Sequence, residues 1–191
     1  MSAGDGMSDA GSSGKPMRRE VSAFAAGICD VPDFPSPGIV FKDITPLWSD
    51  PELFPAAIAA MSAPFRDDHV RKVIGIEARG FIFGSAVALA LGAGFVPARK
   101  PGKLPRPKRR VDYTLEYGVD ALEIHHDAIG ADEACLLVDD VLATGGTARA
   151  AADLVRSAGA RLVGMSFFLE ILALDGRERL ARENVHCVVS V

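Results

Sequence analysis

The sequence predicts an α/β protein with a central, mostly parallel sheet flanked by helices, and two strand–turn–helix segments carry that prediction. In the first, an apolar run over 73–76 precedes the turn 77–80 and a nearly all-apolar helical stretch over 81–91. In the second, an apolar run ends in two carboxylates and a Thr-Gly-Gly-Thr turn within 136–147, and an alanine-rich stretch with helical spacing follows. Each segment is half of a βαβ unit, whose ligands bind beyond the carboxyl end of the strand.

Composition places the chain among ordinary globular proteins. The 191 residues are 49% apolar and 24% charged with a net charge of −4, which argues against global disorder and gives no general attraction to nucleic acid or anionic membranes. No apolar run reaches 18 residues, no hydrophobic leader is visible, and the three cysteines are widely spaced. We therefore expect a cytoplasmic protein that binds neither nucleic acid nor membranes.

The domain organisation follows from where apolar residues begin to recur. Residues 1–16 are mostly Gly, Ser, Ala and Asp, so we expect a disordered tail followed by a single domain over 17–191. Apolar residues at helical spacing from Met17 predict a short amphipathic helix. Three prolines exclude a helix from segment 33–46, which should be extended and form either a surface loop or a piece packed on the core.

The remaining elements complete the alternation of strands and helices. A helix should start near Leu53, because Pro55 would break one that began at Pro51. Further predicted elements are strands over 95–98, 122–125, 162–171 and 186–191, and a short helix over 175–183.

The turn after the 136–142 strand has the composition of a phosphate-binding loop. Gly145 and Gly146 allow a tight backbone with several inward N–H groups, and the N-terminus of the next helix adds partial positive charge. Asp139 and Asp140 would repel a phosphate unless they serve sugar hydroxyls or a magnesium ion. The plainer alternative is that one Asp caps the helix and the glycines only turn the chain. Neither a Walker A loop nor a Rossmann fingerprint is present.

A strongly basic segment follows the 95–98 strand. Residues 99–110 contain seven basic side chains, no acid, three prolines and a glycine, so we expect a mobile loop. Three interpretations stay open: a solvated arm, a nucleic-acid patch, and a cationic flap that closes over a ligand. We assign no purpose to Lys108, Arg109 and Arg110. The adjacent His125 and His126 would lie on opposite faces of a strand, so joint metal binding is not expected.

These motifs, in this order, resemble the type I phosphoribosyltransferases, which use phosphoribosyl pyrophosphate (PRPP). The resemblance covers about 34–183 and implies that family's fold, with a small N-terminal hood at about 17–48 and a flexible catalytic loop. The 136–147 segment resembles the PRPP loop, and 77–80 resembles the pyrophosphate turn, where the family's cis peptide corresponds to Glu77–Ala78. The PRPP-binding residues so implied are Glu77, Ala78, Arg79, Arg99, Lys100, Lys103, Asp139, Asp140, Ala143, Thr144, Gly145, Gly146 and Thr147.

Two further segments resemble the members of the family that use adenine. Segment 33–46 is similar to their base-binding segment, and 113–118 to their catalytic signature. Ala143 stands where the enzymes for hypoxanthine and guanine have an aspartate acting at N7, which favours adenine. The resemblance implies catalysis by Glu116, Tyr117 and Arg79, and adenine binding by Val40, Phe41, Lys42 and Glu170, although Glu170 could equally form only an ion pair.

The implied reaction is that of adenine with PRPP to give AMP and pyrophosphate, a Mg²⁺-dependent pentosyl transfer in purine salvage. Mg²⁺ would bind mainly through PRPP and water, with Asp139 or Asp140 as the candidate protein ligands. A homodimer is implied because the family counterpart of Arg99 reaches the neighbouring subunit's PRPP. Two alternatives stay open: another base, most plausibly xanthine or a pyrimidine, and a PRPP sensor that regulates transcription without turnover.

Overall fold

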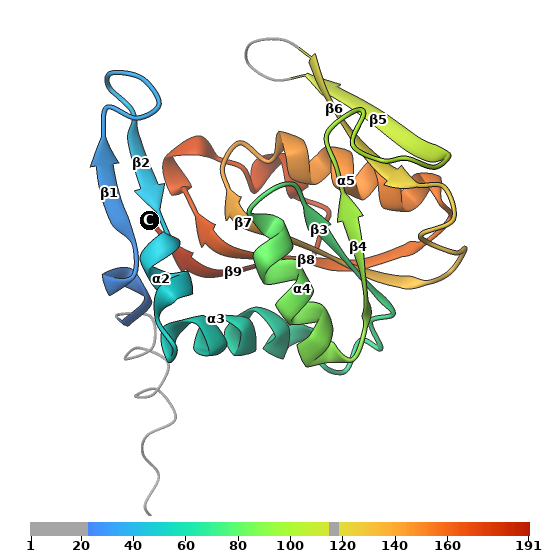
Figure 1. Ribbon diagram of the computed structural model, residues 1–191, viewed down its shortest axis with the longest axis horizontal. Coiled ribbons are helices and arrows are strands. Elements are labelled where there is room, and N and C mark those ends of the chain that lie inside the picture. Colours follow the sequence, from blue (N-terminus) through green and yellow to red (C-terminus); the bar gives the residue numbers. More distant parts are fainter. Residues whose placement is uncertain (1–22, 115–118) are drawn as a thin grey trace, which may run out of the picture. The chain divides into compact units, whose positions relative to one another are not determined.

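The computed structural model describes residues 23–114 and 119–191, and Figure 1 shows the arrangement of their helices and strands. The chain divides into two compact units, one ending at Asp50 and the other comprising Pro51–Val191. No helix in these described ranges is long and apolar enough to cross a membrane. The tail over 1–16 lies outside the described residues, and it stays a prediction together with the single domain from residue 17.

The first unit is built on a β-hairpin, in which β1 (Cys29–Pro32) pairs antiparallel with β2 (Val40–Asp43). Residues 23–26 are helical, as expected for part of the helix predicted from Met17. The extended conformation predicted for 33–46 is confirmed in β2 but wrong at its end, where α2 (Thr45–Ser49) forms. Pro46 fits that helix because it lies in the first turn, where a missing N–H costs no hydrogen bond.

The second unit is organised on a five-stranded sheet in which all neighbouring strands are parallel. Its order is β4-β3-β7-β8-β9, so β4 lies on one side of β3, and the strands β7, β8 and β9 lie on the other side. The predicted parallel sheet is therefore confirmed. Its strands are β3 (Lys72–Ile76), β4 (Gly94–Ala98), β7 (Ala134–Leu142), β8 (Arg161–Glu170) and β9 (Val185–Ser190).

Helices cover both faces of this sheet (Figure 1). On one face lie α3 (Leu53–Ser62) and α4 (Gly80–Leu91), where Phe83 stacks on Phe168 with ring centroids 5.5 Å apart. On the other face α5 (Gly146–Ser157) buries the apolar stripe that its spacing predicted. The predicted start of α3 is confirmed, and a short 3₁₀ helix, η1 (Ala63–Phe65), follows that helix.

An antiparallel hairpin of β5 (Lys108–Thr114) and β6 (Val119–His125) packs against α5. The loop predicted over 99–110 is therefore wrong in its last three residues, which belong to β5. In the ladder, Lys108 lies opposite His125 and Arg110 opposite Glu123. The local composition favoured a loop, but pairing with a strand further along the chain determines the conformation.

The region after β8 differs from the helix predicted over 175–183. Two short 3₁₀ helices, η2 (Leu172–Leu174) and η3 (Glu178–Leu180), are separated by a turn that contains Gly176. A Cβ atom at position 176 would lie 2.1 Å from the carbonyl oxygen of Ala143, in the loop after β7. This backbone contact between distant segments requires a turn and overrides the helical pattern of the sequence.

Candidate active site

The candidate active site lies where β3 and β7 end. From β3 the chain adds β4 on one side and later β7 on the other. The crevice at the carboxyl ends of β3 and β7 is therefore a topological switch point, where parallel sheets bind ligands. Three segments meet at this end of the sheet: the β3 turn (residues 77–80), the cationic turn after β4 (residues 99–103) and the β7 loop (residues 143–147). All three contain residues predicted to bind PRPP.

The β7 loop lines an open pocket of about 320 Å³, which Asp139 and Phe167 also line. Gly145 is the N-cap of α5 and has a φ of +77°, a left-handed conformation that glycine adopts at little cost. The first turn of a helix leaves its N–H groups without carbonyl partners inside the helix. The pocket therefore has the donors and the partial positive charge that suit a phosphate group.

A close backbone contact fixes the shape of the β7 loop. A Cβ atom at Gly145 would lie 2.5 Å from the carbonyl oxygen of Gly176, and one at Gly176 would lie 2.1 Å from that of Ala143. Neither position can carry a side chain unless the loop moves. Gly176 is a site-supporting residue that the sequence reasoning missed, because 175–183 had the pattern of a helix.

The two carboxylates at the end of β7 differ in their partners. Asp140 Oδ2 lies 2.6 Å from Arg79 Nε, and the Asp140 side chain is only 7% exposed. Burial, and then the negative charge of Asp140, raise the pKa of Asp139 well above its usual range. The Arg79–Asp140 ion pair joins the β3 turn to the strand that leads into the β7 loop. Two motifs far apart in the sequence thus form one site.

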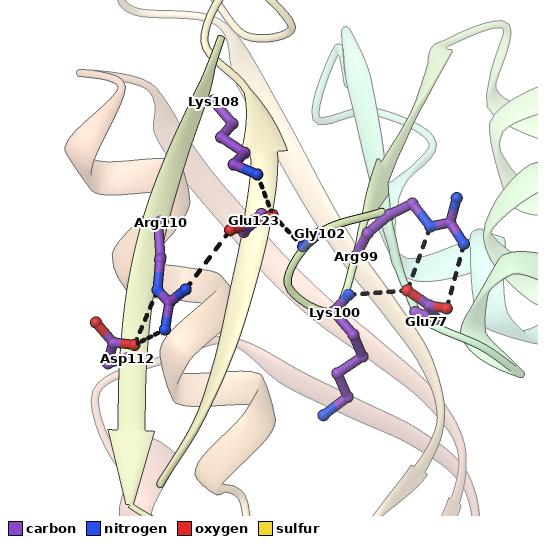
Figure 2. Close-up of polar contacts among 8 residues, drawn as sticks. All are labelled: Glu77, Arg99, Lys100, Gly102, Lys108, Arg110, Asp112 and Glu123. Atoms are coloured by element: carbon purple, nitrogen blue, oxygen red, sulfur yellow. Dashed lines mark hydrogen bonds and ion pairs between the residues drawn. The ribbon is translucent and has the colours of Figure 1, made fainter. Parts of the chain in front are cut away.

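The β3 turn holds the beginning of the cationic turn. The peptide bond between Glu77 and Ala78 is cis, as the resemblance implied. The Glu77 carboxylate accepts hydrogen bonds from Arg99 Nε and a terminal guanidinium nitrogen, both at 3.2 Å, and from the Lys100 backbone N–H at 2.8 Å (Figure 2). The bond from Arg99 is the main reason that the pKa of Glu77 lies below its ordinary value, and the positive charge of Lys103 contributes.

Lys100 connects the cationic turn to the β5–β6 hairpin. Its Nζ donates to the Tyr113 hydroxyl at 3.0 Å and is ion-paired with Asp120. Burial on its own lowers the pKa of Lys100, but the bonds to Asp120 and Tyr113 outweigh it and the pKa lies above its ordinary value. Thr147 Oγ1 lies 3.5 Å from the same Tyr113 hydroxyl, so this tyrosine also bridges to the β7 loop.

The predicted adenine-binding residues Val40, Phe41 and Lys42 lie in β2 and are described within the first unit. Val40 is 51% exposed, and the Phe41 ring meets the Phe34 ring edge-on at 5.2 Å. Lys42 Nζ lies 2.7 Å from Asp30 Oδ1. Their role at the base stays a prediction.

Glu170 ends β8 and forms the ion pair that was its alternative interpretation. Arg177 Nε donates to one carboxylate oxygen at 2.7 Å, and Ser190 Oγ donates to the other at 2.9 Å. Burial on its own raises the pKa of Glu170, but these bonds outweigh it and the pKa lies below its ordinary value. A role for Glu170 at the base stays a prediction.

Two predicted catalytic residues, Glu116 and Tyr117, lie outside the described residues. Sequence reasoning also missed the supporting residues Asp120, Glu123 and Gly176 within the described ranges, and it gave Tyr113 no role beyond the start of the 113–118 signature. The signal for Glu123 was present, because an acid between Leu122 and Ile124 in a predicted buried strand requires partners. Those partners, however, come from segments that only the fold brings close.

Known proteins share this sequence and fold. Residues 50–190 match the phosphoribosyl transferase domain family. The adenine phosphoribosyltransferase of Myxococcus xanthus is 60% identical over 165 residues, which cover 86% of this chain and 90% of the relative. That of Methylococcus capsulatus is 52% identical over 164 residues, covering 86% of this chain and 96% of the relative.

Solved structures extend the likeness to three dimensions. The adenine phosphoribosyltransferase of Rhodothermus marinus has a TM-score of 0.88 at 48% identity, covering 91% of this chain and 99% of that structure. The Saccharomyces cerevisiae enzyme, solved with adenine and an imino-altritol bisphosphate, has a TM-score of 0.85 at 39% identity, covering 90% and 99%. The predicted type I phosphoribosyltransferase fold is thus confirmed. The chain belongs to the phosphoribosyl transferase family and, within it, to the adenine phosphoribosyltransferases.

Proposed function

We propose that the chain transfers the phosphoribosyl group of PRPP to N9 of adenine, giving AMP and pyrophosphate in purine salvage. The observation that carries this proposal is the Arg79–Asp140 ion pair at 2.6 Å, because it joins the β3 turn and the β7 loop into one site. PRPP has phosphates on two sides of a ribose and needs two anion-binding turns with hydroxyl acceptors between them. The names of the relatives support the choice of adenine.

The parts of PRPP divide among the three segments. The β7 loop would bind the 5′-phosphate through backbone N–H groups and the hydroxyls of Thr144 and Thr147. Asp139 and Asp140 would accept hydrogen bonds from the 2′- and 3′-hydroxyls of the ribose. The pyrophosphate would meet Arg79, Lys100 and Lys103 of the same chain, together with the partner's Arg99.

Catalysis in this arrangement is mainly electrostatic. The bond from C1′ to the pyrophosphate oxygen breaks while a bond from C1′ to N9 of adenine forms, and the N9 proton passes to the released pyrophosphate or to solvent. Positive charge develops on the ribose ring and negative charge on the leaving pyrophosphate, so fixed carboxylates and cations at these positions stabilise the transition state. We assign Glu116 to proton movement at the base through N7, and Tyr117 to covering the ribose.

Mg²⁺ is proposed as the metal that screens the pyrophosphate charge when bound. The described residues contain no group of three or more His, Cys, Asp and Glu side chains that could hold a metal. Asp139 and Asp140 can supply one or two oxygens, and Mg²⁺ commonly keeps several waters and substrate oxygens as ligands. The residues present therefore fit a cation that arrives with PRPP.

For the base, we propose recognition by Val40, Phe41 and Lys42, with Ala143 excluding the acid–base chemistry that a 6-oxopurine requires. Val40 and Lys42 would contact the base edge through their backbone, and the Phe41 ring would stack on it. Glu170 would assist only if part of its carboxylate remained available beside Arg177.

We also propose a cytoplasmic homodimer in which Arg99 reaches the partner's PRPP. Within the chain Arg99 is bound by Glu77, so this reach requires that the pair open. The cytoplasmic location is supported by phosphorylated substrates, which do not cross membranes unaided, and by three free cysteines. Sedimentation should give a dimer, and a fully active monomer would overturn that part of the proposal.

The function is tested by measuring pyrophosphate release from PRPP and Mg²⁺ with adenine, hypoxanthine, guanine, xanthine and orotate offered separately. We expect turnover with adenine alone. Turnover with a 6-oxopurine would overturn the assignment to Ala143. Tight PRPP binding without turnover on any base would replace the enzyme with a PRPP sensor.

A further inference from the structure

We propose that Glu123 is a positioning residue that fixes the cationic turn at the pyrophosphate position, and that Lys108 and Arg110 provide the positive charge that its burial requires. The inference rests on the proposed function, because it concerns how the proposed PRPP cations are held. Glu123 lies in the middle of β6, and its side chain is only 2% exposed.

Glu123 holds the cationic turn at two points. Its backbone exchanges two hydrogen bonds of 2.8 Å with the backbone of Arg99, as an isolated bridge outside the named strands. Its carboxylate accepts the Gly102 backbone N–H at 3.1 Å (Figure 2). Gly102, which donates this bond, has a φ of +78°, a left-handed conformation that glycine adopts at little cost. One residue therefore fixes both ends of 99–102.

A second carboxylate holds the same turn from the other side. Glu77 accepts the Lys100 N–H and the Arg99 guanidinium, whereas Glu123 accepts the Gly102 N–H (Figure 2). Arg99 and Lys100, together with Lys103 at the end of the turn, are the predicted pyrophosphate contacts. The backbone of the turn is thus held between two carboxylates, at Lys100 by Glu77 and at Gly102 by Glu123.

The buried carboxylate of Glu123 is compensated by the basic residues that had no assigned purpose. Lys108 Nζ lies 3.1 Å from one Glu123 oxygen, and an Arg110 terminal nitrogen lies 3.8 Å from the other. Arg110 is also paired with Asp112 at 2.6 Å. A buried carboxylate without such partners would be strongly destabilising. These two cations therefore neutralise an internal acid, which argues against the nucleic-acid patch.

Arg109, which lies between Lys108 and Arg110 in β5, contacts the end of α5. Its side chain donates at 3.0 Å to the carbonyl oxygen of Ser157, the last residue of α5. Cations stabilise the carbonyl end of a helix. Successive residues of β5 therefore point to opposite faces of the strand. Arg109 contacts α5, whereas its two neighbours, Lys108 and Arg110, contact Glu123.

The consequence for the reaction is specific to PRPP. A misplacement of about 1 Å in positioned groups can lower a rate about 100-fold. Without the Gly102 bond, the turn keeps its charges but loses their position. The affinity for PRPP and pyrophosphate should therefore fall, whereas the affinity for adenine, which the cationic turn does not contact in this proposal, should not.

The test compares Glu123→Ala and Glu123→Gln with the control Asp127→Asn. Asp127 is a carboxylate paired with Arg106 at 2.6 Å, and both side chains are more than half exposed. We expect Glu123→Ala to raise KM for PRPP at least tenfold, with KM for adenine unchanged, because a positioned contact is lost. Glu123→Gln keeps an acceptor for Gly102 and should restore most of the PRPP affinity when Lys108→Met is added. Asp127→Asn should match the wild type.

A second readout does not depend on activity. Amide hydrogen exchange at Gly102 in the free protein should be at least tenfold faster in Glu123→Ala than in the wild type, and unchanged in Asp127→Asn. If Glu123→Ala does not fold, the Glu123→Gln and Lys108→Met double-mutant cycle still measures the coupling.

Three results would overturn the inference. They are equal rises in KM for both substrates, unchanged kinetics in Glu123→Gln and Glu123→Ala, or unchanged exchange at Gly102. A wild-type chain without turnover would instead overturn the proposed function, and the exchange result would still decide whether Glu123 fixes the turn.

Discussion

The β7 loop and the cationic turn serve the same proposed ligand but are built differently. The β7 loop offers mainly backbone N–H groups, and its shape depends on a close backbone approach that leaves no room for a Cβ atom at Gly145 or Gly176. The cationic turn offers side-chain charges, and its shape depends on hydrogen bonds to two carboxylates, Glu77 and Glu123. The loop that offers backbone groups is thus held in shape by steric contact, whereas the turn that offers cationic side chains is held in shape by hydrogen bonds to carboxylates.

The largest effect should come from breaking the steric contact. Gly176→Ala places a Cβ 2.1 Å from the Ala143 carbonyl oxygen, so the β7 loop must move. We expect a loss of about 3 kcal/mol in the free energy of unfolding, as for overpacking of a tight contact. Denaturant unfolding measures it. Gly130→Ala is the control, because its nearest atoms would lie 3.6 Å away, and an equal loss in both variants would refute the steric account.

The second-largest effect should come from the Arg79–Asp140 ion pair, which joins the β3 turn to the strand that leads into the β7 loop. Asp140→Asn keeps the side-chain shape but removes the charge that faces Arg79 at 2.6 Å. We expect kcat/KM for PRPP to fall about 30-fold, or about 2 kcal/mol of transition-state stabilisation. Steady-state kinetics measures the fall, with the exposed Asp153→Asn as control. A change of less than about threefold would mean that this pair does not organise the site.

A smaller effect is expected at the carboxylate that holds Arg99. Glu77→Gln weakens the charge-assisted bond from the Lys100 backbone N–H that holds the cationic turn, and we expect KM for PRPP to rise about tenfold with little change in KM for adenine. The matched control is Glu183→Gln, since Glu183 also pairs with an arginine, at 2.6 Å from Arg156 Nη2, but lies outside the three site segments. Equal kinetic effects of the two substitutions would contradict the account.

The smallest effect concerns stability in acid. The pKa of Glu170 lies below its ordinary value of 4.5, so the folded state binds fewer protons there than the unfolded chain, and this stability is present above pH 4.5 and lost as the pH falls through the folded pKa. Arg177→Met should cost about 1 kcal/mol at pH 7 and less below pH 4. Urea unfolding at both pH values tests this, and a cost that grows in acid would have the wrong sign.

Local patterns predicted those parts of the fold and site that depend on neighbours in the sequence. The strand, the paired acids and the glycine turn around 136–147 are consecutive, so their arrangement at the end of β7 was predictable. The partners of Lys108 and Arg110 were not, because Glu123 approaches them only when β5 pairs with β6. Gly176 was missed for the same reason, since its partner Ala143 follows the neighbouring strand β7 and a helical pattern surrounded Gly176.

The central claim is that the β7 loop binds the 5′-phosphate and the cationic turn binds the pyrophosphate. Calorimetric titration of AMP and, separately, of pyrophosphate with Mg²⁺ into Thr147→Val and Glu77→Gln tests it most directly. We predict that Thr147→Val weakens AMP binding alone and Glu77→Gln weakens pyrophosphate binding alone, each by about tenfold. Equal weakening of both ligands by either substitution would contradict this division of the site.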